Sequence, residues 1–380
     1  MLPLEGILVL EFAQFMAGPS AGLKLADMGA RVIKIERPIK GESGRQIAIK
    51  NLFIENDSLV FHTINRNKES YSANLRDAED LAKIKQLIAH ADIMTHNFRP
   101  GVMEKYGLDY INIEKINPSI IYGVVSGYGP KGPWAKKPGQ DLLIQALSGL
   151  CYLTGNQNDP PTPMGLAVAD MFTGTHLVQG LLAAFFQKQK TGKGAKVEVS
   201  LLESALDLQF EVLTTFLNDG NQVPKRAVRG NAHPYLSAPY GIYETLDHHI
   251  AIAMIPLDKL ADLMSIQLTD RFQVPSTWFD HRDEIMQFIN QYFSQKSTQY
   301  WLEIFEAADV WCAPIYEYKD LINHEAFKVL EMMQEVVTSK GEQIKTTRCP
   351  IRIDGNRIFS QKAAPKVGED NMKIEAEFKL

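Results

Sequence analysis

Apolar residues in the first part of the chain fall into short runs of strand length, separated by segments with helical spacing. The first run covers residues 6–12 and the second covers residues 30–36, and Pro19 between them suits the first turn of a helix. A strand, a helix and a second strand in this order form a β-α-β unit with parallel strands and a right-handed crossover. The pattern therefore predicts an α/β domain built on a parallel sheet.

The same alternation continues to about residue 217. We expect further strands over residues 70–75, 92–97, 119–126 and 195–200, two short helices within residues 102–116, and further helices over residues 77–90, 141–149, 171–190 and 202–217. The run at 119–126 contains no charged residue and reads as a buried strand, covered on both faces. We therefore expect one large, Rossmann-like domain over residues 1–217.

The pattern changes after residue 217. Residues 218–234 are polar and contain Gly and Pro, which predicts a linker. Residues 235–334 predict a smaller α+β domain with a second linker, in which a hairpin over residues 240–254 is followed by three helices. The alternation over 335–353 predicts a closing hairpin, and we expect the polar tail with it to complete the large domain over residues 335–380.

Composition and charge narrow the class of protein. The chain is 45% hydrophobic and 22% charged, as in globular enzymes, and its net charge of −5 gives no electrostatic reason to expect nucleic acid or an anionic membrane as a partner. Three cysteines without paired spacing argue against disulfides and a zinc site, and Glu5 and Glu11 in the N-terminal segment argue against a signal peptide. We expect a cytoplasmic protein without a metal.

One stretch stands out chemically: residues 165–174, with the sequence G-L-A-V-A-D-M-F-T-G. It places a single carboxylate, Asp170, among small and apolar residues at the start of the predicted helix 171–190. The side chain would either cap that helix or react with a substrate that its small neighbours admit. Backbone N–H groups of these small residues could then stabilise an oxyanion. The local sequence leaves both interpretations open.

Other candidate groups follow predicted strands, where α/β sheets bind their ligands. Arg37, Asn97 and the Gln140–Asp141 pair are examples, and each alone is better explained by a structural role, as a strand-end charge or a cap. Together they could surround a phosphorylated ligand. The turn A-G-P-S-A-G lacks the dinucleotide fingerprint G-x-G-x-x-G, which argues against a nicotinamide dehydrogenase.

Six ordered motifs are similar to those of one known family. They are V-I-K-I-E-R-P, A-D-I-M-T-H-N-F-R-P-G-V, N-P-S-I-I-Y-G-V-V-S-G-Y-G-P-K-G-P, Q-D-L-L-I-Q-A-L-S-G-L, A-D-M-F-T-G and K-T-G-K-G-A-K-V-E-V-S-L. The chain resembles the family III CoA-transferases, a group that includes formyl-CoA transferase, carnitine CoA-transferase and 2-methylacyl-CoA racemase. The resemblance spans residues 4–208 and returns weakly over 364–369.

The resemblance implies a two-domain chain that forms an interlocked homodimer and uses an aspartate nucleophile, which matches Asp170. It implies an acyl-CoA and a small carboxylic acid as substrates, with coenzyme A as a substrate rather than a tightly bound cofactor. The positions that match the family's CoA contacts are Met16, Ala17, Arg37, Ala73, Asn74, Leu75, Arg76, Asn97, Phe98, Arg99, Lys105, Gln140 and Asp141.

Departures from the family pattern bear on the substrate. Met16 replaces a glutamine near the acyl group, Lys105 replaces an arginine, and residues 229–235 lack the glycine-rich lid of formyl-CoA transferase, which argues against oxalate. The resemblance implies CoA transfer from an acyl-CoA to a free carboxylate through an aspartyl anhydride and an aspartyl-CoA thioester. A racemase of the 2-methylacyl-CoA type is the alternative, although Gln140 stands where the racemases have a histidine.

Overall fold

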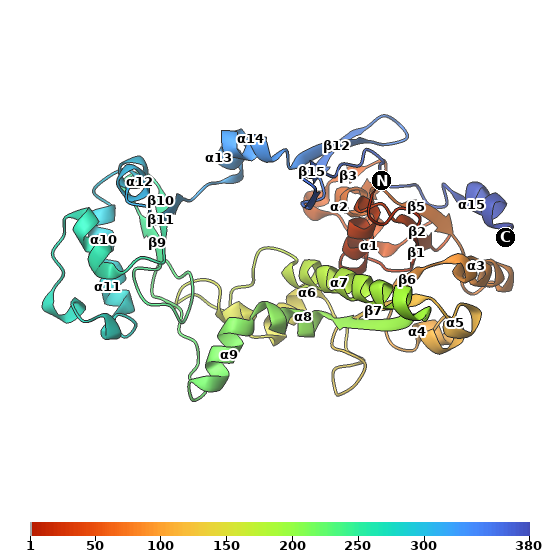
Figure 1. The fold of residues 1–380 in the computed structure, drawn as a ribbon, viewed down its shortest axis with the longest axis horizontal. Coiled ribbons are helices and arrows are strands. Elements are labelled where there is room, and N and C mark those ends of the chain that lie inside the picture. Colours follow the sequence, from red (N-terminus) through yellow and green to blue (C-terminus); the bar gives the residue numbers. More distant parts are fainter. Residues whose placement is uncertain (1) are drawn as a thin grey trace. The chain divides into compact units, whose positions relative to one another are not determined.

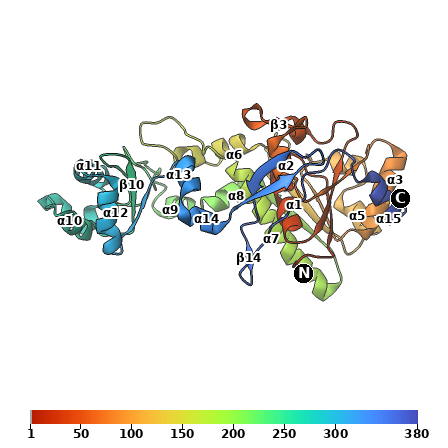
Figure 2. The same cartoon turned by 90° about the horizontal axis from the view of Figure 1, so that it is seen from above.

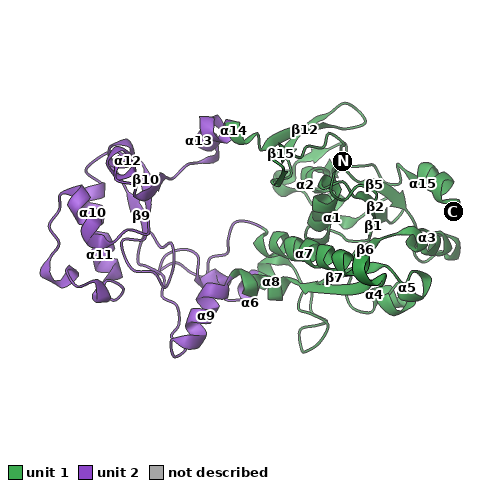
Figure 3. Cartoon of the chain, viewed as in Figure 1, with its two compact units in different colours: residues 1–144, 167–208, 329–380 green, residues 145–166, 209–328 purple. Residues whose placement is uncertain are grey.

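The computed structural model describes residues 2–380, which form two compact units (Figure 3). The first unit contains the chain up to Ile144 together with Ala167–Leu208 and Val329–Leu380. The second unit contains Gln145–Leu166 and Gln209–Lys328. Each unit has its own hydrophobic core and is described by itself.

A six-stranded parallel sheet forms the centre of the first unit (Figures 1 and 2). Its strands are β1 (Leu8–Glu11), β2 (Arg31–Glu36), β5 (Glu69–Ser72), β6 (Ile93–His96), β7 (Ile121–Ser126) and β8 (Ala195–Ser200). They lie in the order β5-β2-β1-β6-β7-β8, and every pairing is parallel. The predicted parallel α/β fold is therefore confirmed, with the strand order of the Rossmann fold.

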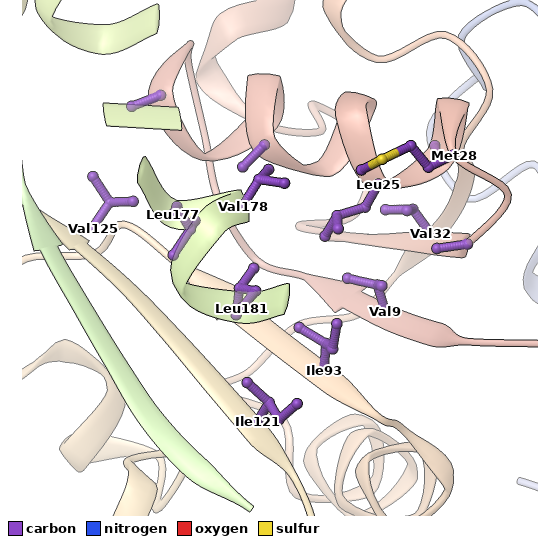
Figure 4. Close-up of a cluster of buried hydrophobic side chains, with 14 of the residues drawn as sticks. Val9, Leu25, Met28, Val32, Ile93, Ile121, Val125, Leu177, Val178 and Leu181 are labelled. Carbon is purple, nitrogen blue, oxygen red and sulfur yellow. The ribbon is translucent and has the colours of Figure 1, made fainter. Parts of the chain in front are cut away.

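Helices cover both faces of this sheet. On one face lie α1 (Ala17–Asp27), α7 (Val168–Thr191) and α8 (Leu201–Leu208); on the other lie α3 (Ala78–His90), α5 (Tyr110–Ile116) and α15 (Asn371–Phe378). Figure 4 shows the first core, in which Leu177 and Leu181 of α7 pack above Ile93 and Ile121 of the sheet. Within residues 2–380, no helix combines the length and apolar character needed to cross a membrane.

Shorter elements complete the first unit. They are β3 (Phe53–Ile54), β4 (Asp57–Ser58), α2 (Leu59–Ile64), α4 (Val102–Lys105), β12 (Met333–Val337), β13 (Gln343–Thr347), β14 (Arg352–Ile353) and β15 (Asn356–Arg357). Helix α6 (Asp141–Leu147) begins in this unit, and its last three residues are assigned to the second unit. The predicted closing hairpin is present as β12 and β13. The predicted strand over 70–75 ends earlier than expected, at Ser72.

The polar tail contains a helix that the sequence pattern did not predict. Asp370 and Asn371 lead into α15, and their side-chain oxygens accept hydrogen bonds from the backbone N–H groups of Ser70 and Ser72, both at 2.9 Å. These bonds satisfy donors of β5, the edge strand of the sheet. Ile374 of the helix is fully buried, which explains why so polar a segment docks.

An antiparallel sheet of three strands and three helices form the core of the second unit. The strands are β9 (Gly241–Glu244), β10 (His249–Ala253) and β11 (Trp311–Pro314), and the helices are α10 (Leu257–Met264), α11 (Arg282–Phe293) and α12 (Thr298–Ala307). The predicted hairpin and its three following helices are present, whereas β11 was not predicted. The helices α9 (Phe210–Asn218), α13 (Tyr318–Asn323) and α14 (Glu325–Leu330) lie outside this core.

The division of the chain differs from the one that the sequence predicted. Residues 145–166 and 209–217 belong to the second unit, and the expected helix over 202–217 is interrupted at Gln209. Residues 218–234 are not a free linker, because Arg226 in this segment is only 8% exposed. Its guanidinium donates to the carbonyl of Thr154 at 2.7 Å, which holds the 145–166 segment in the same unit.

Candidate active site

The strand order of the large sheet reverses between β1 and β6, and ligands of open α/β sheets bind outside the carboxyl ends of the strands at such a point. The turn of residues 12–16 follows β1 here, and Asn97 follows β6. Asn97 Oδ1 accepts from the backbone N–H of Gln14 at 2.8 Å, and its Nδ2 donates to the carbonyl of Gln14 at 2.6 Å. Asn97 therefore ties the two strand ends together.

Four buried charged side chains adjoin this turn. Glu11, Lys34 and Lys68 are 0% exposed and Glu42 is 3% exposed. The Lys68 ammonium donates to both carboxylate oxygens of Glu11 at 2.9 Å, and the Lys34 ammonium lies 3.1 Å from Glu11 and 3.2 Å from Glu42. Two positive and two negative charges thus compensate one another, as burial of charge requires.

Asp170 is the third residue of α7 and does not cap the helix. The N-cap is Ala167, whose side chain makes no capping hydrogen bond. The cap comes from another helix: Asp141 Oδ1 accepts from the N–H of Ala169 at 2.7 Å and from the N–H of Asp170 at 3.2 Å. The capping interpretation of Asp170 is therefore wrong. The same two bonds occupy N–H groups that the sequence had suggested as oxyanion donors.

The carboxyl group of Asp170 is unusually basic. Burial, followed by the negative charge of Asp141, raises the pKa of Asp170 from 3.8 to about 7. Both effects disfavour the charged form, and they outweigh the opposite influence of the helix N-terminus. A carboxylate with this pKa is a better nucleophile and a better base than an ordinary aspartate, and it is still substantially ionised at neutral pH.

Helix α1 lies close to the start of α7, and a glycine makes this possible. A Cβ on Gly174 would lie 2.0 Å from Ser20 Oγ and 2.7 Å from the carbonyl oxygen of Ala17. Gly174 follows Asp170 by about one helical turn, so Ala17 and the preceding Met16 lie near the nucleophile candidate. The structure thus brings together Met16, Ala17 and Asp170 from segments that are far apart in the sequence.

Four cations among the predicted CoA contacts are exposed at the carboxyl edge of the sheet or just beyond it. They are Arg37 after β2, Arg76 beyond β5, Arg99 after β6 and Lys105 at the end of α4. Arg37 Nε donates to the carbonyl of Gly41 at 2.6 Å, which holds this side chain against its own turn. Exposed cations of this kind suit an anionic ligand such as a phosphate.

The other predicted contact residues are engaged within the protein. Ala73 is buried and its N–H donates to the carbonyl of Glu36, Asn74 Oδ1 accepts from the N–H of Arg76, and Gln140 Oε1 accepts from the N–H of Leu142. Leu75 and Phe98 are half-buried and pack against the core under α3. These residues shape the edge of the sheet, and Asp141 caps α7.

The buried charges were not predicted as site residues, although the sequence contains a signal for them. Glu11 is the one charged residue of the run 6–12, and Lys34 stands between Ile33 and Ile35 in the run 30–36; both runs predict strands. A charged residue inside a buried strand requires a buried partner of opposite charge. Glu42 and Lys68 lie in polar surroundings in the sequence, so nothing local singles them out.

Several known proteins resemble this chain over almost its whole length. The model of CoA-transferase family III matches residues 4–371. The human succinyl-CoA:glutarate CoA-transferase is 32% identical over 98% of this chain and 85% of its own length, and the acetyl-CoA:oxalate CoA-transferase of Acetobacter aceti is 30% identical over 99% and 96%. A crystal structure of a CAIB/BAIF family protein from Brucella suis has a TM-score of 0.85 and 31% identity, covering 99% of each chain.

The fold and the relatives together define the family of this chain. The family match covers nearly the whole chain, and full-length relatives are named CoA-transferases. The chain therefore belongs to CoA-transferase family III.

Proposed function

We propose that this enzyme moves CoA from an acyl-CoA to a free carboxylic acid through covalent intermediates on Asp170. The observation that carries the proposal is the basic carboxylate of Asp170, with a pKa of about 7, at the start of α7 beside Ala17. A nucleophile must be ionised and accessible to attack a thioester, and this half-buried carboxylate meets both conditions near neutral pH.

The proposed chemistry has two halves. The carboxylate of Asp170 attacks the thioester carbon, the C–S bond breaks, and a mixed anhydride and the CoA thiolate result. The thiolate attacks the aspartyl carbon of the anhydride, which releases the donor acid and leaves an aspartyl-CoA thioester. The acceptor acid then repeats both steps in reverse and regenerates Asp170.

We propose that the exposed cations at the carboxyl edge bind the phosphates of the acyl-CoA. Arg37 and Lys105 are the residues that we assign to the nucleotide end of this substrate, on the basis of the family pattern and their exposure. Coenzyme A enters and leaves as part of a substrate, so the proposal includes no resident cofactor.

Two observations weigh against the racemase alternative. Racemisation needs one group that removes the α-proton and another that returns it from the opposite face. Gln140, at the position where the racemases have a histidine, has no titratable group, and its Oε1 accepts from the N–H of Leu142. His176 lies along α7 and is bonded to Ser204 at 2.9 Å and to Asp207 at 3.1 Å, so it is held toward α8.

A substrate screen tests the proposed function. Acetyl-CoA and succinyl-CoA are incubated with a panel of mono- and dicarboxylic acids that includes glutarate and oxalate, and the CoA esters are separated by chromatography. We expect transfer to at least one acid, and weak transfer to oxalate because Met16 is apolar. In heavy water, 2-methylacyl-CoA should gain no α-deuterium. Rapid exchange without transfer to any acid would establish the racemase instead.

We also propose that two copies of the chain interlock in a cytoplasmic homodimer, with the second unit as the small domain of each copy. The support is the family resemblance and the course of the chain, which leaves the first unit after Leu208 and returns to it at Val329. An interlocked dimer cannot dissociate without substantial unfolding. Analytical ultracentrifugation of a dilution series should therefore show dimer at nanomolar concentration, and a folded monomer would contradict the proposal.

A further inference from the structure

Phe15, in the turn after β1, has an unusual backbone and an exposed ring. Its φ is +66°, in the left-handed region that bulky residues rarely adopt. Its side chain is 46% exposed, so the ring gains little from packing in the described chain. Strain of this kind persists where the surroundings enforce it, and it is concentrated at functional sites.

Three side chains from elsewhere in the fold hold the backbone of this turn at three successive residues. The Lys34 ammonium donates to the carbonyl of Ala13 at 2.8 Å, and Asn97 bonds both backbone polar groups of Gln14. The N–H of Phe15 donates to Glu42 Oε2 at 2.9 Å. The same carboxylate oxygen accepts from the N–H of Gly44 at 3.1 Å. Glu42 is therefore the group that fixes the strained residue itself.

The turn lies next to the nucleophile. Met16 follows Phe15 directly and is the N-cap of α1, whose first turn approaches α7 at Gly174. Both helices begin at the carboxyl edge of the sheet, and Asp170 lies about one turn before Gly174. The residues that precede α1 are thus on the same side as Asp170.

We propose that Phe15 is a specificity-determining residue of the transfer reaction proposed above, and that Glu42 is its positioning residue. The ring of Phe15 forms a wall beside Asp170 that limits the width of the acyl group next to the reacting carbonyl. The inference rests on the proposed function, because it assumes that the acyl carbon is attacked by Asp170. Groups on carbon 2 of the acid are the nearest to that carbon, so the wall favours unbranched acids.

The test compares acceptor acids of increasing width. The ratio of kcat/KM for isobutyrate to kcat/KM for propionate is measured with acetyl-CoA and with succinyl-CoA as donors. We expect Phe15→Val and Phe15→Gly to raise this ratio about tenfold or more, since one methyl group in a tight apolar site is worth at least that factor. The KM for the acyl-CoA donor should change less than twofold.

Two controls separate specificity from folding. Phe186 is an exposed aromatic residue near the far end of α7, 64% exposed, and Phe186→Val should leave the ratio unchanged. Phe15→Gly removes the backbone strain, because glycine adopts positive φ freely, so its Tm should equal or exceed that of the wild type. A changed ratio in this variant therefore does not come from damage to the fold.

Hydrogen exchange tests the role of Glu42. In the wild-type protein the amide of Phe15 should exchange slowly although its side chain is exposed, and Glu42→Gln should accelerate that exchange at least tenfold. Fast exchange in the wild type would refute the positioning role. A wild-type enzyme that transfers CoA, with a ratio unchanged within twofold in both Phe15 variants, would refute the inference alone. A wild type without any transfer would refute the proposed function and the inference with it.

Discussion

Asp170→Asn is expected to lower the turnover of CoA transfer by at least about 10³-fold. The amide retains the shape of the side chain but cannot form an anhydride with an acyl group. The Asp141 cap of α7 uses only backbone N–H groups of Ala169 and Asp170, so the substitution leaves it in place. The variant should therefore fold normally while losing almost all activity.

The raised pKa of Asp170 predicts how both activity and stability depend on pH. In the wild type, kcat/KM should fall as the pH drops below about 7, because the protonated carboxyl group is not a nucleophile. The pKa of this carboxyl group is 3.8 in the unfolded chain, so the folded protein binds the proton more tightly. The wild type therefore loses stability as the pH rises from about 4 to 7. At pH 8 the free energy of unfolding of Asp170→Asn should thus exceed that of the wild type by about 1–3 kcal/mol, after allowance for solvent screening. At pH 4 the two free energies should be nearly equal.

Turnover assays, urea denaturation at both pH values and mass spectrometry check these results. Treatment with hydroxylamine or borohydride during turnover should label the peptide that contains Asp170 in the wild type only. Asp207→Asn is the matched control, because Asp207 is a nearby exposed carboxylate that pairs with His176 and has no proposed role in the chemistry. Retained transfer in Asp170→Asn would exclude the covalent mechanism.

Glu11→Gln is expected to destabilise the enzyme by about 3–5 kcal/mol. The substitution removes one of the two negative charges in the buried cluster and leaves the ammonium groups of Lys34 and Lys68 with Glu42 as the remaining anion. Both lysines are fully buried, so neither can recover the lost interaction from water. The turn of residues 12–16 should also become less well held, because the Lys34 ammonium donates to the carbonyl of Ala13.

The free energy of unfolding from urea denaturation measures this effect. Lys328→Met is the control, because Lys328 pairs with Glu325 on the surface, where their side chains are 54% and 82% exposed. Such a pair contributes roughly 0.2–1 kcal/mol. If Glu11→Gln cost no more than this surface control, the buried cluster would not be what holds the turn.

The parallel sheet and the candidate nucleophile were both accessible from the sequence. Strand runs such as 6–12 and 30–36 and the helical spacing after Asp170 are local patterns, and local patterns report which face of an element is buried. The family motifs then assigned a reactive role to Asp170 that its neighbours alone left open. The sequence pattern places the start of the helix only approximately, at Met171, and so allows Asp170 as a cap, although Asp170 is the third residue of α7.

The sequence by itself determined the strands of the large sheet, their parallel arrangement and the carboxylate at the start of α7, because these depend on residues within about one element of each other. Only the tertiary structure decided that Asp141 caps α7, that burial and then the charge of Asp141 raise the pKa of Asp170, and that Glu42 holds Phe15 in a left-handed conformation. It also decided that Arg226 draws residues 145–166 into the second unit. Each of these interactions joins residues that lie 27 or more positions apart in the sequence. The spacing of apolar residues cannot predict which distant charged side chain will bond to which backbone group.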